Sequence, residues 1–320
     1  MATVFCRRLV RIPSRLIAFA ALVVVLGLSS SCGSDSPSPT QPTPPTGGTE
    51  PPPPPAPPPP PPAASEEIFV GAGDIGLCST DGAKQTGRLL DRIDGTVFTL
   101  GDHAYPHGTM EHFMECYEPA WGRHKARTRP SPGNHDRIRA EDTGYFAYFG
   151  SRAGPPGRGY YSYELGAWQI YSLNSHALED ADAAQLVWLS NELKRNASAG
   201  GCQLAYFHIP VYNPRSKMGR HWQLLAAAGV DLVLTAHEHW YQRFRPLDAS
   251  FNPHPRGIRQ IVAGTGGGLL YDRDVPERHS ELSISALGVL KLTLKENSYD
   301  WEFVPVSSRA DTDSGSGDCH

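Results

Sequence analysis

Four short apolar segments of this 320-residue chain each lead into side chains that can bind a metal ion. The segment FVGAG leads into Asp74, TVFTL into Asp102, LAYF into His208, and DLVLTA into His237 and His239. Short apolar runs bounded by turn residues are typical of buried strands. Open α/β sheets place their binding sites beyond the carboxyl ends of the strands. The pattern therefore predicts a sheet whose strand ends gather potential ligands at one edge.

Strands and helices alternate through the rest of the folded part. Further strands are predicted at WQIYSL and RQIVAG, and helical spacing occurs in AKQTGRLLDRI, DAAQLVWLSNELKR and HWQLLAAAG. This alternation indicates the α/β fold class. The segment GVLKLTLKENSYDWEFVPV is expected to add an antiparallel hairpin that turns at Glu296–Ser298. We place the domain at residues 66–308 and expect the apolar-poor tail, residues 309–320, to be loose.

The first 32 residues predict an export leader. Four arginines precede the apolar run 16–28, which is about 13 residues long, whereas a membrane-spanning helix needs about 20. The small residues that follow end at Cys32 and resemble a bacterial lipoprotein signal, in which that cysteine carries the lipid. We therefore expect an exported cell-envelope lipoprotein, periplasmic or on the cell surface, attached to the membrane at Cys32. A retained membrane-spanning anchor is the alternative.

Residues 33–65 are expected to be a disordered linker. Between Pro37 and Pro62 lie 16 of the 30 prolines of the chain, so no packed core can form there. The run Pro57–Pro62 favours the polyproline helix, which rises about 3.1 Å per residue and makes a semi-rigid spacer. A ligand for a proline-binding module is the alternative interpretation of this segment.

Four cysteines remain if Cys6 leaves with the leader and Cys32 is lipidated: Cys78, Cys116, Cys202 and Cys319. An exported chain permits disulfides, and four cysteines allow three pairings. We favour a bridge between Cys78 and Cys116 because both flank the motif loops. The net charge of −4, without a basic run, argues against a nucleic-acid partner.

Short motifs accompany the predicted strand ends in a fixed order. They are GDIG at 73–76, GDHAY at 101–105, GNHD at 133–136, AYFHIPVYN around His208 and AHEHWYQR around His237. With these motifs the chain resembles the calcineurin-like metallophosphoesterases, and within them the purple acid phosphatase branch. The resemblance covers about residues 66–306. It implies a metallophosphoesterase-type αββα sandwich with mixed sheets in a single catalytic domain.

The resemblance also implies a site for two metal ions with seven protein ligands. One ion would be held by Asp74, Tyr105 and His239, the other by Asn134, His208 and His237, with the Asp102 carboxylate bridging the two. His135 would face the phosphate and its leaving group without binding an ion. Two positions depart from the family pattern: Ala236 stands where Gly is usual, and Asp136 stands where many purple phosphatases have Glu. Neither departure removes a ligand.

Phosphate ester hydrolysis needs a strong nucleophile and a way to absorb charge on the phosphoryl group, and two ions about 3.5–4 Å apart supply both. A phenol with an ordinary pKa near 10 binds as phenolate only to a strongly Lewis-acidic ion, so Tyr105 favours Fe(III) at its site. Imidazoles and an amide suit a divalent ion such as Zn, Mn or Fe. We therefore expect an acid phosphatase-like enzyme that hydrolyses phosphate monoesters of small molecules with a metal-bound hydroxide as nucleophile. A phosphodiesterase or nucleotide hydrolase on the same site, or a non-catalytic surface binding protein, are the alternatives.

Two other features near the motifs have structural interpretations. His103 and His107 lie in the loop of Asp102 and are expected to face solvent or the rim of the site. The glycines of GTGGG, residues 264–268, are not followed by the Lys and Ser or Thr of a phosphate-binding loop. We expect them to form a tight turn near the site.

Overall fold

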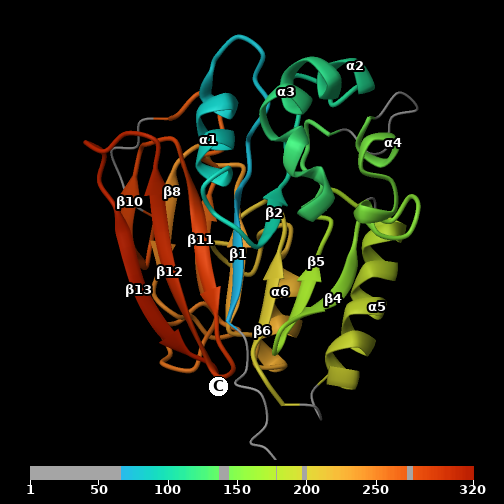
Figure 1. Ribbon diagram of the computed structural model, residues 1–320. Coiled ribbons are helices and arrows are strands. Elements are labelled where there is room, and N and C mark those ends of the chain that lie inside the picture. The colour runs from blue at the N-terminus through green and yellow to red at the C-terminus, as the bar shows by residue number, and fades with distance from the viewer. Residues whose placement is uncertain (1–65, 137–143, 178, 197–199, 272–276) are drawn as a thin grey trace, which may run out of the picture. The chain divides into compact units, whose positions relative to one another are not determined.

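The computed structural model describes residues 66–136, 144–177, 179–196, 200–271 and 277–320 (Figure 1). The predicted leader and linker, residues 1–65, lie outside the described residues. All described residues belong to one compact unit, Pro60–His320. Within these ranges, no helix has the length and apolar character that a membrane crossing requires.

The first sheet has six strands in the order β13-β12-β11-β1-β2-β3. Its strands are β1 (Glu67–Ala72), β2 (Thr96–Leu100), β3 (Thr128–Ser131), β11 (Gly288–Leu294), β12 (Ser298–Pro305) and β13 (Asp313–Asp318). Strands β1, β2 and β3 are parallel, whereas β11, β12 and β13 extend the sheet in antiparallel fashion. The predicted hairpin is confirmed as β11 and β12. Strand β3 was not predicted, because Pro130 within it argues against a strand. Proline is tolerated here because β3 lies at the edge of the sheet.

The second sheet has seven strands in the order β10-β8-β9-β7-β6-β5-β4. Its strands are β4 (Tyr161–Leu165), β5 (Trp168–Ser172), β6 (Gln203–Tyr206), β7 (Leu232–Thr235), β8 (Tyr241–Phe244), β9 (Arg259–Ala263) and β10 (Ser280–Ile284). Strands β5, β6, β7 and β9 are parallel, and β4, β8 and β10 run antiparallel to their neighbours. Both sheets are therefore mixed, as expected.

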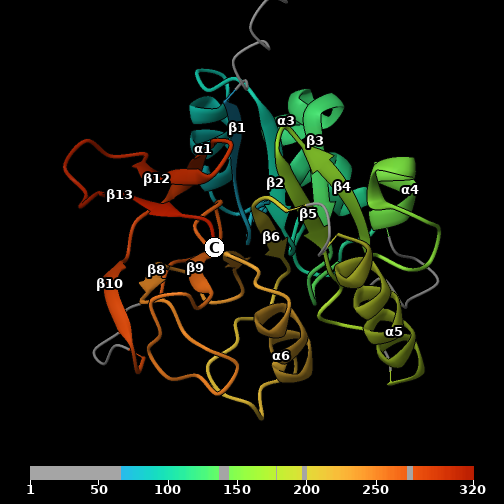
Figure 2. The same ribbon diagram turned by 90° about the horizontal axis from the view of Figure 1, so that it is seen from below.

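Helices cover the outer faces of the two sheets (Figures 1 and 2). The first sheet carries α1 (Gly82–Leu90), α2 (Met110–His112), the π-helical turn Phe113–Tyr117, α3 (Glu118–Trp121), the 3₁₀ segments Gly122–Arg127 and Gly150–Ala153, and α4 (Tyr145–Phe149). The second sheet carries α5 (Glu179–Asn196) and α6 (Gly219–Ala227). The three long helices coincide with the predicted helical segments.

Three layers of buried side chains hold this sandwich together. Because side chains alternate along a strand, Phe69 of β1 faces the second sheet while Val70 faces the helices of the first. The layer between the sheets joins Phe69 to Leu204 of β6. The outer layer of the second sheet packs the β7 residue Val233 against Trp222 of α6. Helix, sheet, sheet and helix thus form the expected αββα arrangement.

The expectation of a loose tail at residues 309–320 is wrong. Residues Asp313–Asp318 form β13, which pairs with β12, so the domain continues beyond residue 308. The strand has few apolar side chains because Gly315 lies over the Trp301 indole, where an added Cβ would come within 2.3 Å of a ring atom. A carboxylate fixes its start, since Asp313 accepts hydrogen bonds from the Tyr241 hydroxyl and the Trp301 indole N–H. Backbone pairing with β12 and the polar contacts of Asp313 order the tail. A prediction based on the pattern of apolar residues cannot detect such contacts.

Both disulfides lie within the described residues. Cys78 pairs with Cys116, which confirms the favoured bridge, and Cys202 pairs with Cys319. The second bridge attaches the end of β13 in the first sheet to the residue that precedes β6 in the second.

Candidate metal centre

The predicted ligands lie at the edge of the sandwich where the parallel strands of both sheets end. Asp74 and Asp102 each follow their strands, β1 and β2, by two residues, and His208 and His237 follow β6 and β7 by two residues. Asn134 follows β3. The arrowheads of β2, β5 and β6 point to the same edge in Figure 1. Residues more than a hundred positions apart in the chain therefore meet at one place.

Asp74, Tyr105 and His239 form the first cluster of side chains. The Tyr105 hydroxyl donates to Asp74 Oδ1 at 2.8 Å and lies 3.1 Å from His239 Nε2. His239 Nε2 lies 3.3 Å from the same Asp74 oxygen. All three residues are buried, with Asp74 completely inaccessible to solvent. Three potential ligand atoms thus converge on one point.

Asn134, His208 and His237 form the second cluster. His208 Nε2 lies 2.9 Å from Asn134 Oδ1 and 3.0 Å from His237 Nδ1. Asp102 stands between the clusters, because its Oδ2 is 3.4 Å from His208 Nε2 and 3.2 Å from the Tyr105 hydroxyl. One carboxylate oxygen therefore faces both clusters. The structure brings all seven predicted ligands together.

Hydrogen bonds at the far side of two imidazoles determine which nitrogen faces the centre. His208 Nδ1 lies 2.7 Å from the carbonyl oxygen of Leu100, and His239 Nδ1 lies 2.6 Å from that of Leu269. A carbonyl only accepts, so each Nδ1 carries the hydrogen and donates it. Each Nε2 is then free to offer a lone pair beside carboxylate and amide oxygens. Imidazoles oriented in this way, together with oxygen donors, have the chemistry of a metal site.

Protons compete with metal ions for these atoms. Burial disfavours a charged His208, but the Asp102 carboxylate outweighs burial and raises the pKa of His208 to about 9. Burial, together with the Asp74 and Asp102 carboxylates, raises the pKa of Tyr105 far above its ordinary value. At these two atoms the negative charge of the Asp74 and Asp102 carboxylates therefore favours a bound proton or a bound cation. Cation binding at these atoms must release protons, so it weakens as the pH falls.

Three ligand positions hold their backbone in the left-handed region. The φ angles are 57° at Asp74, 51° at Asp102 and 69° at His237, and the other non-glycine residues with positive φ in the described ranges are Phe251 and His279. This conformation costs on the order of 1 kcal/mol or more at a non-glycine residue and persists only where the surroundings impose it. Here the His237 N–H donates to Asp74 Oδ2 at 2.8 Å, which joins two of the three positions. The concentration of strained residues marks this edge as functional.

Asp136 joins the loop of Asp102 to the loop of Asn134. Its carboxylate accepts the backbone N–H groups of Asp102 and His103 at 3.0 Å and that of Gly133 at 2.8 Å. The ring of His103 contacts the same carboxylate at 2.8 Å and is fully buried. The expectation that His103 faces solvent or the rim is therefore wrong, because an aromatic pocket encloses it; that pocket is formed by Phe113, Tyr117, Tyr145 and Phe149. His107 is exposed, as expected.

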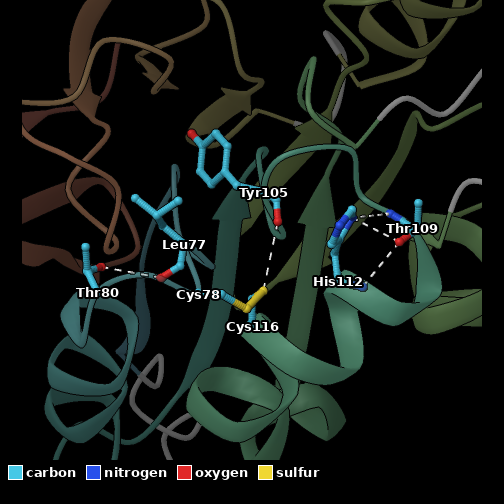
Figure 3. Close-up of a disulfide and its surroundings, with 7 residues drawn as sticks. All are labelled: Leu77, Cys78, Thr80, Tyr105, Thr109, His112 and Cys116. Atoms are coloured by element: carbon cyan, nitrogen blue, oxygen red, sulfur yellow. Dashed lines mark hydrogen bonds between the residues drawn. A yellow bond between two sulfur atoms is a disulfide. The ribbon is translucent and has the colours of Figure 1, made fainter.

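The Cys78–Cys116 disulfide lies behind Tyr105 (Figure 3). Cys78 belongs to the loop that follows Asp74, and Cys116 belongs to the π-helical turn that follows the Tyr105 loop. Cys116 Sγ is 3.9 Å from the Tyr105 carbonyl oxygen, which is a packing contact because a disulfide sulfur carries no hydrogen. The bridge therefore ties together the two loops that carry Asp74 and Tyr105.

The GTGGG segment forms a tight turn against the centre, as predicted. Gly266 N–H donates to the Gly73 carbonyl at 2.8 Å, and Gly268 N–H donates to the Asp74 carbonyl at 2.7 Å. At Gly264 an added Cβ would come within 2.7 Å of Asp74 Oδ2. The turn therefore supports the ligand Asp74, and glycine permits the close approach.

His135 adjoins the centre and is only partly buried. Its Nδ1 donates to the Pro106 carbonyl at 2.7 Å, and its ring centroid is 4.6 Å from that of Tyr105. Its backbone N–H donates to Asp102 Oδ1 at 2.8 Å. The bond to Pro106 leaves Nε2 as the nitrogen that is available to a ligand.

The sequence interpretation missed His176, which follows β5 at the same edge. Its ring centroid is 5.8 Å from that of His208, and its Nε2 is buried without a hydrogen-bond partner among the described residues. Burial, with the neighbouring His208, lowers the pKa of His176 to about 3, so the imidazole is neutral. The signal that marks the predicted ligands, a polar side chain just beyond an apolar strand, was also present in WQIYSLNSHA.

Comparison with known proteins places the chain in a family. The profile described as calcineurin-like phosphoesterase matches residues 69–241, more than half of the chain. "Purple acid phosphatase 18" of Arabidopsis thaliana is 29% identical over 230 residues, which cover 62% of this chain and 49% of the plant protein. The chain thus spans about half the length of the curated relatives it matches.

Two solved structures share the fold. The purple acid phosphatase PPD1 of yellow lupin, Lupinus luteus, superposes with a TM-score of 0.54 at 17% identity, covering 79% of this chain and 54% of the lupin chain. GAP50, the anchor in the inner membrane complex of Plasmodium, superposes with a TM-score of 0.65 at 14% identity, covering 80% of this chain and 89% of that protein. At 17% and 14% sequence identity, these superpositions show a shared fold alone.

A methyl group at Gly133 is expected to impair metal binding. A Cβ at this position would lie 2.2 Å from Asp102 Oδ1, so Gly133→Ala must displace the carboxylate that faces both clusters. We expect the affinity for Zn²⁺ or Mn²⁺, measured by calorimetry on metal-stripped protein, to fall by about 10- to 100-fold. Gly157→Ala is the control for backbone strain alone, because its φ of 76° disfavours a side chain while no atom lies within 4 Å of a Cβ there. Equal affinities in the two variants would contradict a role for Asp102 in holding the ions.

Proposed function

The chain belongs to the calcineurin-like phosphoesterase family, and we propose that it hydrolyses phosphate monoesters of small molecules at a pair of metal ions. The observation that carries this proposal is the position of Asp102, one of whose carboxylate oxygens faces both side-chain clusters. A shared carboxylate is what two closely spaced cations require. The relationship to purple acid phosphatases supports the choice of monoesters.

Each cluster would hold one ion. Asp74, Tyr105 and His239 would bind the first, Asn134, His208 and His237 would bind the second, and Asp102 would bridge them. When bound, such a pair acidifies a water molecule and neutralises charge on the phosphoryl group. The protein holds the ligands in place through Asp136, the glycine turn and the carbonyl groups that orient the imidazoles.

His135 is proposed as the residue that assists departure of the leaving group. The bond from Nδ1 to the Pro106 carbonyl fixes the ring, and Nε2 can then donate a hydrogen bond or a proton to the ester oxygen. Its partial exposure at the rim, beside the buried Tyr105, suits contact with a substrate. His135 is not needed as a metal ligand, since each ion already has three side chains and a share of Asp102.

Charge explains how an acidic chain would attract a phosphate. A trivalent and a divalent ion together carry five positive charges, and the two aspartates and a Tyr105 phenolate neutralise three of them. Two positive charges remain, so the centre is net positive although the chain carries a formal charge of −4. Bound ions dominate the field in their own site.

Hydrolysis of matched esters tests the proposed activity. The metal-loaded protein is expected to hydrolyse 4-nitrophenyl phosphate with a higher kcat/KM than bis(4-nitrophenyl) phosphate. In His135→Asn, kcat for the monoester should fall by about 10²- to 10⁴-fold while the metal content stays unchanged, because the variant loses only proton transfer. His107→Asn, which changes an exposed histidine nearby, is the matched control. Preference for the diester would favour a phosphodiesterase, and absence of all hydrolysis would favour a binding protein.

We propose Fe(III) at the Tyr105 site and Zn, Mn or Fe(II) at the other. Displacing the phenolic proton of Tyr105, whose pKa is raised by burial and two carboxylates, takes a strongly Lewis-acidic ion. Elemental analysis should find about two metal ions per chain, and the visible spectrum should contain a purple to pink charge-transfer band that disappears in Tyr105→Phe. A colourless protein that contains only zinc would refute the iron assignment and leave the fold unaffected.

We also propose that the chain is exported and tethered to the cell envelope by a lipid on Cys32, with residues 33–65 as spacer. The arginine-rich start and the short apolar run 16–28 support export, as do two disulfides, which persist in oxidising compartments. In a bacterial host, labelled palmitate should enter the protein and be lost in Cys32→Ser but retained in Cys6→Ser. Labelling that survives in Cys32→Ser would contradict the proposal.

A further inference from the structure

An exposed tyrosine lies directly against the metal centre. The ring of Tyr271 is stacked on the imidazole of His239, with centroids 4.4 Å apart and planes inclined by 7°. Although His239 covers one face of this ring, 46% of Tyr271 is exposed, and the neighbouring Leu269 is 62% exposed. The Trp240 ring also contacts Tyr271 in an edge-to-face arrangement, with centroids 6.1 Å apart, and Tyr271 nevertheless keeps almost half of its surface open to solvent. Two large apolar side chains thus stand beside a ligand of the first cluster.

Hydrogen bonds fix this exposed pair to the centre. Tyr271 N–H donates to the His239 carbonyl at 3.2 Å, and His239 Nδ1 donates to the Leu269 carbonyl at 2.6 Å. The Ser285 hydroxyl donates to the Tyr271 carbonyl at 3.1 Å. Gly268, one residue before Leu269, is bonded to the Asp74 carbonyl. The segment that carries Tyr271 is therefore anchored at several points to the ligand residues themselves.

The Tyr271 ring lies where the organic group of a bound phosphate ester would leave the metal centre. A phosphate at the ion pair would be in contact with the ion held by His239, and the group esterified to it must extend toward the surface. Tyr271 lies one stacking distance from that imidazole and presents an aromatic surface beside it. Aromatic rings attract other aromatic rings in offset-stacked or edge-to-face arrangements.

We propose that Tyr271, with Leu269, forms an aromatic platform that selects phosphate monoesters of planar aromatic alcohols. The inference rests on the proposed phosphomonoesterase function and names the class of its substrates. A residue whose task is only to support His239 has no need of so large an exposed apolar surface, which it shares with the neighbouring Leu269. The ring of an aryl phosphate is attached directly to the ester oxygen, so it fits a platform adjoining a metal ligand better than a nucleobase, which a ribose separates from its phosphate.

Binding of two phosphonates to the metal-loaded protein tests the platform without turnover. Calorimetry is expected to show that phenylphosphonate binds up to about tenfold more tightly than methylphosphonate, which corresponds to the upper end of the range for an aromatic pair. Tyr271→Ala should abolish this preference and leave methylphosphonate binding and metal content unchanged, whereas Tyr271→Phe should retain it. Val187→Ala, which removes an exposed apolar side chain from α5, is the matched control and should have no effect.

Steady-state kinetics should agree with binding. In Tyr271→Ala, KM for phenyl phosphate should rise about tenfold, while kcat changes little and kcat/KM for glycerol 2-phosphate is unaffected. Uniform loss for both substrates, or loss of a metal ion, would overturn the proposal in favour of a supporting role for Tyr271. A stronger effect on nucleoside 5′-monophosphates than on phenyl phosphate would overturn the choice of aryl esters. Selective phenylphosphonate binding without hydrolysis of any ester would refute the proposed function and leave the platform intact.

Discussion

The Asp102 carboxylate is the contact on which the centre depends, because it faces two clusters that different parts of the chain supply. Each cluster takes ligands from both sheets. In the first cluster His239 comes from the second sheet, and in the second cluster Asn134 comes from the first. A single carboxylate can face both only if the two sheets keep their strand ends in register. The bond from His208 Nδ1 to the Leu100 carbonyl makes this connection directly, since it joins the end of β6 to the end of β2. The bond from His237 N–H to Asp74 Oδ2 joins the ends of β7 and β1 in the same way. Fold and site are thus coupled through hydrogen bonds between the strand ends of the two sheets and through the packing beneath them.

The backbone around Asp102 is held in conformations that non-glycine residues rarely adopt. Asp74, Asp102 and His237 adopt left-handed backbone conformations, and Gly133 approaches Asp102 so closely that a side chain cannot be accommodated. The three backbone N–H groups that bond to Asp136 offset this strain, because a buried carboxylate with several donors makes strong bonds. His103 occupies the remaining side of that carboxylate within an aromatic pocket. Residues that bind no ion thus hold the ligands in strained positions.

Strand ends explain why so much of the centre could be predicted from the sequence. Apolar runs that stop at Asp, Asn or His are visible in the letters, and parallel strands bring those ends to one edge whatever the details of the loops. Contacts that depend on shape were not visible. The burial of His103 depends on the aromatic helices that follow it. The strand β13 depends on Gly315 lying over Trp301 and on pairing with β12. The stacking of Tyr271 depends on a turn more than 160 residues from Asp102. His176 had the right signal, but no motif drew attention to it.

The two disulfides restrain the sandwich at opposite ends of its strands. Cys78–Cys116 lies at the edge that holds the ligands, whereas Cys202 precedes β6 and lies at the other end, near the C-terminus in Figure 1. The Cys202–Cys319 bridge joins the two sheets covalently, and the Asp231 carboxylate reinforces it by accepting the backbone N–H groups of Gln203 and His320 at 2.8 Å. Because each cluster takes ligands from both sheets, a rotation of one sheet against the other would displace ligands within both clusters at the far edge. The Cys202–Cys319 bridge therefore restrains, at one end of the strands, the relative position of the two sheets on which both clusters depend at the other end, and the tail that carries Cys319 contributes to this restraint.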